Sequence, residues 1–192
     1  MRPVDYAVLA QRAYSDPPTI GQAGSASRMH VYVDGPSTVH VFRGTDNFGS
    51  LLADGNITTI NVAGLGNVHT GFYVALAAIL PACLALPRPT AIAGHSLGAA
   101  MAILYAGILA QLGTVVPVYA FEPPRVANDD TLARLLATKQ VPWFACRNGR
   151  DAITQIPLHL EHAGPIQAIG RAVLPFDNLG DHAIARVIDA LR

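Results

Sequence analysis

The 192-residue sequence is poor in charged residues. Only 14% of its residues are Asp, Glu, Lys or Arg, and the 13 basic and 13 acidic side chains balance to a formal net charge of zero. Nucleic-acid-binding proteins usually carry a basic stripe, and this sequence has none, so a nucleic-acid partner is not expected. Hydrophobic residues make up 51% of the chain, which argues against a disordered polypeptide and is enough for one domain with a substantial core.

Cysteines and long apolar runs are also scarce. Cys83 and Cys146 are too few for a disulfide framework, so we expect two buried thiols. The apolar segments 74–86 and 97–112 contain a proline or several small residues and are too short for a transmembrane helix. The first residues lack the apolar core of a signal peptide, which predicts a cytoplasmic protein or one released by a non-classical route.

Signatures of cofactor binding are missing as well. The glycine spacings of nucleotide-binding loops, G-x-G-x-x-G and G-x-x-x-x-G-K-[ST], do not follow any expected strand. His, Cys and Asp residues do not cluster at metal-ligand spacing. We therefore expect neither a cofactor nor a metal ion.

The sequence does contain Gly-His-Ser-Leu-Gly at residues 94–98, after an apolar run at 90–93 and before a run of small and apolar residues at 99–104. A strand, a tight turn and a helix in this order are the context in which G-x-S-x-G forms a nucleophile elbow. The flanking glycines relieve clashes at so sharp a turn. Ser96 is therefore the predicted nucleophile, and the amide of Leu97 at the helix start is a predicted oxyanion donor. The alternative is an ordinary glycine-rich turn of a doubly wound sheet.

Strands and helices alternate around this motif. Because such alternation favours a parallel sheet covered on both faces, we expect one α/β domain. The expected elements are helices at 4–14, 71–86, 97–112, 128–138 and 181–191, strands at 29–33, 38–43, 90–93, 115–121 and 143–147, and a hairpin within 165–176. Residues 44–70 are expected to form a long loop.

A serine nucleophile needs a histidine to take its proton and a carboxylate to orient that histidine. After a nucleophile elbow the acid comes next in the chain and the histidine last. Asp151 follows the expected strand 143–147 through a polar turn and is the predicted acid, with Glu122 as its rival. His182, close to the final helix, is the predicted base, and His162 is the competitor.

His95 and a second oxyanion donor are the remaining features expected near the elbow. His95 is adjacent to the nucleophile, but strand alternation should turn it away, so we interpret it as a packing residue. A second oxyanion donor is expected from the loop after an earlier strand. Gly44 would let the backbone approach there, and Thr45 offers both an amide and a hydroxyl group.

Taken together, these segments resemble the class 3 (fungal-type) lipase family of α/β-hydrolases. The matching segments, in order, are Val-Phe-Arg-Gly-Thr-Asp at 41–46, Val-His-Thr-Gly-Phe at 68–72, Gly-His-Ser-Leu-Gly-Ala at 94–99, Tyr-Ala-Phe-Glu-Pro-Pro-Arg-Val-Ala-Asn at 119–128, Arg-Asn-Gly-Arg-Asp at 147–151, and His182. The resemblance implies a single α/β-hydrolase domain over residues 1–192, with a mostly parallel central sheet, helices on both faces and a lid-like segment at about 46–67. Glu122 departs from the pattern, because the family usually has glycine there.

The same resemblance implies roles for individual residues. By it, Ser96 is the nucleophile, Asp151 the acid, His182 the base and Thr45 the oxyanion threonine. The implied activity is hydrolysis of acylglycerols or related lipid esters through an acyl-enzyme, at a membrane or micelle surface, with apolar contacts from the region of Phe48. A phospholipase, a short-chain esterase or an acyltransferase could use the same residues. The alternative from another class is an inactive hydrolase fold that serves as a binding module.

Overall fold

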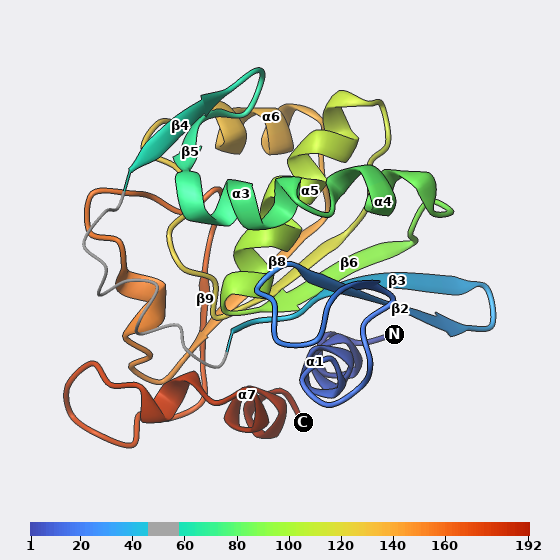
Figure 1. The fold of residues 1–192 in the computed structure, drawn as a ribbon. Helices are drawn as coiled ribbons and strands as arrows, with labels where there is room; N and C mark the ends of the chain where they lie inside the picture. Colours follow the sequence, from blue (N-terminus) through green and yellow to red (C-terminus); the bar gives the residue numbers. More distant parts are fainter. Residues whose placement is uncertain (46–57) are drawn as a thin grey trace.

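The computed structural model describes residues 1–45 and 58–192. Across these ranges one sheet has seven strands in the order β1-β2-β3-β6-β7-β8-β9 (Figure 1). Their bounds are Ile20–Gly21 for β1, Arg28–Asp34 for β2, Ser37–Phe42 for β3, Ala91–His95 for β6, Val118–Phe121 for β7, Trp143–Asn148 for β8 and Gln167–Ile169 for β9. Strand β2 is antiparallel to both of its neighbours, and every later neighbouring pair is parallel.

Helices cover both faces of this sheet, as the sequence predicts. One face carries α1 (Pro3–Arg12) and α7 (Ile184–Leu191), and the other carries α3 (Thr70–Ala77), α4 (Leu80–Ala85), α5 (Leu97–Gln111) and α6 (Thr131–Thr138) (Figure 1). Helix α5 is apolar on all sides, which suits a helix buried between the sheet and its neighbours. Helix α7 buries only a stripe around Val187 and Ile188. Each face therefore has its own hydrophobic core.

The register of the sheet gathers several strand ends at one edge. Phe42 pairs with Gly94, His95 with Phe121, and Phe121 with Cys146, so β3, β6, β7 and β8 end side by side. In open parallel sheets, ligands bind outside this carboxyl edge. The segments that follow these strands therefore meet in one place.

Two expectations about segments near the sheet were wrong. Residues 165–176 do not form a hairpin: β9 is an edge strand parallel to β8, because pairing with the open edge of β8 overrides the local turn signal at Gly170. The expected loop 44–70 contains a hairpin of β4 (Thr59–Val62) and β5 (Gly66–His69), whose turn uses glycines with positive φ.

Three helix boundaries also differ from expectation. The helix expected at 71–86 is divided between α3 and α4, because Pro81 lacks an N–H group and lies in the first turn of a new helix. Helix α6 begins after Asp130, not after Asn128. The last expected helix begins with a separate 3-10 turn, η2 (Gly180–His182), before α7.

The predictions about the cysteines, membrane-spanning helices and the lid-like segment can be compared with the described residues. Cys83 and Cys146 are buried free thiols, as predicted. Within residues 1–45 and 58–192, the helices lack the combined length and apolar character needed to cross a bilayer. Most of the lid-like segment predicted at about 46–67, including Phe48, lies outside the described residues, so the lid stays a prediction.

The close approach of α5 to β3 generates a stability prediction. A Cβ at Gly98 would overlap the carbonyl oxygen of Phe42, which belongs to rigid backbone. Gly98→Ala is therefore expected to lower the free energy of unfolding by about 2 kcal/mol or more, as measured by urea denaturation.

The matched control is Gly113→Ala, at a position with φ of 79° and no atom within 4 Å of the added Cβ. This variant bears only the conformational cost of the left-handed region, on the order of 1 kcal/mol. Equal losses in the two variants would contradict the close-approach explanation.

Candidate active site

Ser96 lies in the sharp turn between β6 and α5. Its φ of 59° and ψ of −128° are unfavourable for a residue with a side chain, so the surrounding structure must hold it there. Its N–H group donates to the Phe121 carbonyl oxygen over 3.0 Å, and its own carbonyl oxygen accepts from Ala99 N–H. A Cβ at Gly94 would overlap the backbone of Gly98, which explains the glycine two residues before the serine. The segment has the geometry predicted for a nucleophile elbow.

The structure brings the predicted base and acid to this serine. His182, in η2, places its Nε2 atom 2.8 Å from Ser96 Oγ. Its Nδ1 atom lies 3.0 Å from Asp151 Oδ1, in the segment that follows β8. The Asp151 side chain is fully buried, and that of His182 is 15% exposed. This arrangement can move a proton from the serine hydroxyl to the imidazole ring.

The buried carboxylate of Asp151 is hydrogen-bonded by local backbone groups. Its carboxylate accepts hydrogen bonds from Ile153 N–H at 2.9 Å and Thr154 N–H at 3.3 Å. These donors belong to the 3-10 turn η1 (Ile153–Gln155), which begins two residues after Asp151. Hydrogen bonds to the charged form favour it, so this buried carboxylate is compensated before it contacts the histidine.

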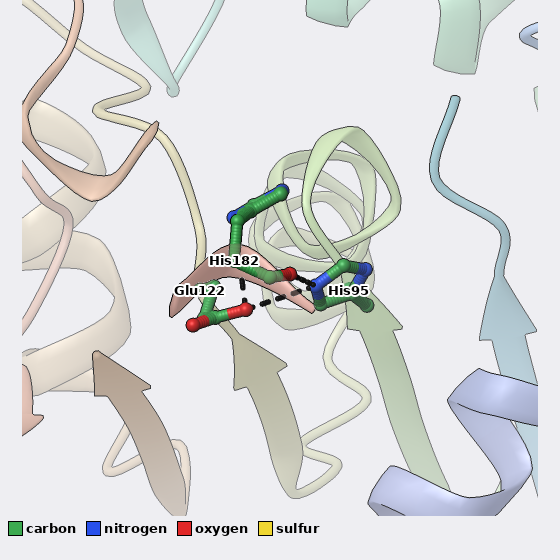
Figure 2. A group of neighbouring side chains, drawn as sticks. All are labelled: His95, Glu122 and His182. Carbon is green, nitrogen blue, oxygen red and sulfur yellow. Dashed lines mark hydrogen bonds and ion pairs between the residues drawn. The ribbon is translucent and has the colours of Figure 1, made fainter. Parts of the chain in front are cut away.

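Glu122, the rival acid, also lies beside the base. Its Oε2 atom is 3.6 Å from His182 Nδ1 and 3.1 Å from His95 Nε2 (Figure 2). Burial, reinforced by the nearby charge of Asp151, raises the pKa of Glu122 well above its ordinary value. The Glu122 carboxyl group is therefore protonated at neutral pH.

His95 is part of a polar network, so its interpretation as a packing residue was wrong. Its Nδ1 atom is 2.7 Å from the Tyr14 hydroxyl oxygen, and its Nε2 atom is 3.0 Å from the His182 carbonyl oxygen. Burial, together with the neighbouring His182, lowers the pKa of His95 well below its ordinary value, so the ring is neutral. These partners assign the tautomer: Nε2–H donates to His182 and Glu122, and Nδ1 accepts from Tyr14.

This network also accounts for the close grouping of His95, Glu122 and His182, whose potential ligand atoms lie within 4.8 Å of one another (Figure 2). In the assigned tautomer, His95 Nε2 carries a hydrogen and offers no lone pair to a metal ion. The grouping is therefore explained by hydrogen bonding.

The competitor base, His162, lies in a different place. Its Nε2 atom is 2.9 Å from the Thr154 carbonyl oxygen, and burial lowers the pKa of its ring. The structure does not bring it to Ser96 as it does His182.

The predicted oxyanion residues lie beside the same groups. Leu97 is the first residue of α5, so its N–H group is not used within the helix. Thr45 lines a pocket of about 290 Å³ together with Tyr14, His95, His182 and residues 183–185. A Cβ at Gly44 would overlap the Tyr14 hydroxyl group, so glycine allows the Thr45 loop to lie against the site.

Asp181 connects the loop of Asp151 to the loop of His182, a position not predicted from the sequence. Its carboxylate accepts from Arg150 N–H at 2.9 Å and from Val173 N–H at 3.1 Å. Its carbonyl oxygen accepts from the Asn148 side chain at 2.9 Å. Burial opposes the ionised form, but the hydrogen bonds from Arg150, Asn178 and Val173 hold the pKa of Asp181 below its ordinary value. Its only signal in the sequence is its position next to His182.

Asp181→Asn is expected to loosen both loops. The NH2 group of the new side chain would face a backbone N–H donor, so at least one hydrogen bond is lost. We expect the melting temperature to fall by about 3 °C or more. We also expect kcat to fall about tenfold, because the loops that carry Asp151 and His182 are held less precisely. The control is Asp189→Asn, which removes an exposed carboxylate of α7 that pairs with Arg192.

The stability difference has a defined pH dependence. The folded-state pKa of Asp181 is lowered, so its contribution is present above the unfolded-state value of about 4 and is lost as the pH falls through the folded-state value. The difference in melting temperature between wild type and Asp181→Asn should therefore shrink below about pH 4. A difference that is independent of pH would contradict the role given to the Asp181 charge.

Comparisons with known proteins agree with this fold and site. The sequence profile of the class 3 lipases matches residues 39–161. The triacylglyceride lipase of Rhizomucor miehei superposes with a TM-score of 0.76 at 20% identity, over 94% of this chain and 91% of that chain. Lipase II from Rhizopus niveus gives a TM-score of 0.72 at 20% identity over the same shares of the two chains. The lipase from Rhizopus microsporus var. chinensis gives 0.74 at 21% identity, over 91% of this chain and 75% of that one.

At these identities the solved structures establish the fold, which is the predicted α/β-hydrolase fold. The family profile covers more than half of the chain and establishes the family. The chain therefore belongs to the class 3 lipase family and is a serine hydrolase that acts on carboxylic esters.

Proposed function

We propose that this hydrolase cleaves lipid esters through an acyl-enzyme formed on Ser96. The observation that carries the proposal is the pair of contacts made by one ring, 2.8 Å from Nε2 to Ser96 Oγ and 3.0 Å from Nδ1 to Asp151 Oδ1. His182 takes the hydroxyl proton as Oγ bonds to the ester carbonyl carbon. It then gives that proton to the departing alcohol. Water repeats the attack on the acyl-enzyme and releases the carboxylic acid.

Asp151 is the acid in this proposal, and Glu122 is not. The carboxylate that steadies an imidazolium must be ionised at the working pH. Two backbone N–H groups compensate the charge of Asp151, whereas burial keeps Glu122 protonated. Asp151 is also the nearer of the two carboxyl groups to Nδ1 of His182.

The proposed oxyanion hole consists of Leu97 and Thr45. The Leu97 amide is at the amino end of α5, where the helix dipole favours negative charge. Thr45 lines the same pocket as His182. Its hydroxyl and amide groups are suitable donors for the charge that develops on the ester carbonyl oxygen.

The pocket favours an ester with a short or medium acyl chain. Its lining includes Ala183, Ile184 and Ala185, which suit a hydrocarbon chain. Its volume of about 290 Å³ is at the lower end of the range of roughly 300–1,000 Å³ that is typical of small-molecule sites. One relative of this fold is named a triacylglyceride lipase, which supports an acylglycerol as the ester.

The first test is hydrolysis of a 4-nitrophenyl ester series from acetate to palmitate. We expect activity with an optimum at short or medium chains, and we expect Ser96→Ala to lower kcat by about 10⁴-fold or more. The control is Ser15→Ala, which removes an exposed hydroxyl that donates to the Arg12 carbonyl oxygen. Equal rates for wild type and Ser96→Ala would contradict the proposed nucleophile, and an optimum at palmitate would contradict the assignment of chain length.

The second test concerns the Thr45 hydroxyl group. Thr45→Val keeps the shape of the side chain and the amide, and it should lower kcat about 100-fold with a smaller change in KM, because the donor acts on charge in the transition state. Thr90→Val is the control, since that hydroxyl bonds to Thr38 at the opposite end of β6. Undiminished turnover in Thr45→Val would remove the hydroxyl from the oxyanion hole.

A further inference from the structure

We infer that Glu122 is a second positioning residue for His182, able to take the place of Asp151. The inference rests on the proposed function, because it concerns the base of that mechanism. It adds a carboxyl group at the end of β7 to a site whose proposed acid follows β8.

The geometry that carries this inference is the convergence of two N–H groups on one oxygen. Glu122 Oε2 lies 3.1 Å from His95 Nε2 and 3.6 Å from His182 Nδ1 (Figure 2). A carboxylate oxygen can accept two hydrogen bonds, so a small shift of the side chain would let it accept from both rings. The main chain at this residue is anchored, since Glu122 N–H donates to the Cys146 carbonyl oxygen over 2.9 Å.

The charges around Glu122 decide which carboxyl group is ionised. The titratable and charged groups that face it are His95 of β6, Cys146 of β8, Asp151 after β8, His182 and Asp181 of η2, and Arg186 of α7. Among these, the Asp151 carboxylate opposes ionisation of Glu122 most strongly after burial itself. Burial and the neighbouring Asp151 carboxylate therefore keep Glu122 protonated.

Removing the Asp151 charge removes the second-largest cause of the raised pKa and leaves burial as the first, so Glu122 ionises at a lower pH than in the wild type. Glu122 can then release its proton to solvent, and its carboxylate accepts the Nδ1–H of His182. The catalytic step is otherwise unchanged: Nε2 takes the Ser96 proton as Oγ bonds to the carbonyl carbon, and the same proton leaves with the alcohol. The rival explanation is that Glu122 serves only as a structural partner of His95.

A double-mutant cycle on kcat/KM separates these explanations. Asp151→Asn removes the charge, and Glu122→Gln keeps the size of the side chain while removing its ability to ionise. We expect Glu122→Gln to lower kcat/KM more than tenfold further in the Asp151→Asn background than in the Asp151 background. Effects that multiply independently would overturn the inference.

The pH profile supplies a readout that a purely structural role would not change. In Asp151→Asn, kcat/KM should rise with pH as Glu122 ionises, giving an ascending alkaline limb. That limb should be missing from Asp151→Asn/Glu122→Gln. Its presence in both variants would overturn the inference, because Glu122 could not then be its source.

Variants at buried positions also need a check on folding. Circular dichroism and thermal unfolding show whether each variant folds. If Asp151→Asn does not fold, Asp151→Ala replaces it in the cycle. The wild-type fold gives an independent measurement, the low-field NMR resonance of His182 Nδ1–H. It should shift at alkaline pH as Glu122 ionises and should not shift in Glu122→Gln, and an identical response in both would overturn the inference.

The same measurements test the proposed hydrolase activity and the role of Glu122 separately. A wild-type protein that shows no Ser96-dependent hydrolysis would contradict the proposed function. Ser96-dependent hydrolysis with an additive Asp151 and Glu122 cycle would contradict only the role of Glu122.

Discussion

The position of one imidazole ring, that of His182, is the constraint on which the rest of the site depends. The ring must reach Ser96 with one nitrogen and face a carboxyl group with the other, yet it belongs to a short 3-10 turn. Bonds from the rigid sheet edge anchor that turn. His95 Nε2–H donates to the His182 carbonyl oxygen, and the Asn148 side chain donates to that of Asp181. The strands therefore fix the position of the loop that carries His182.

The electrostatics of the site follow from placing two carboxyl groups beside that ring. A buried site tolerates one compensated charge more easily than two adjacent ones. Backbone N–H groups of η1 compensate Asp151, while burial keeps Glu122 protonated and His95 neutral. A neutral His95 also places no positive charge beside His182.

The elbow was predictable because its constraints are local. The positive φ of Ser96 and the close contact between Gly94 and the backbone of Gly98 arise within five consecutive residues, whereas the contact of Gly98 with the Phe42 carbonyl oxygen involves a distant strand. Asp151 and His182 were predicted from their order along the chain after Ser96. The structure places both beside Ser96, because parallel strands bring their carboxyl ends to one edge of the sheet. The role of His95 could not be predicted in this way, since its partner Tyr14 is 81 residues distant in sequence. Strand β9 was missed for a similar reason, because it exists only through its pairing with β8.

Glu122, at the end of β7, has a backbone conformation that is unusual for a residue with a side chain. Its φ of 50° is a conformation in which glycine is favoured, and the class 3 lipase resemblance leads one to expect glycine at this position. A side chain there costs on the order of 1 kcal/mol, so interactions of that side chain must offset the strain. The contact with His95 is such an interaction, and it directs the carboxyl group toward His182. The backbone thus places one carboxyl group after β7 and another after β8, and burial together with the nearby Asp151 carboxylate keeps the one after β7 protonated.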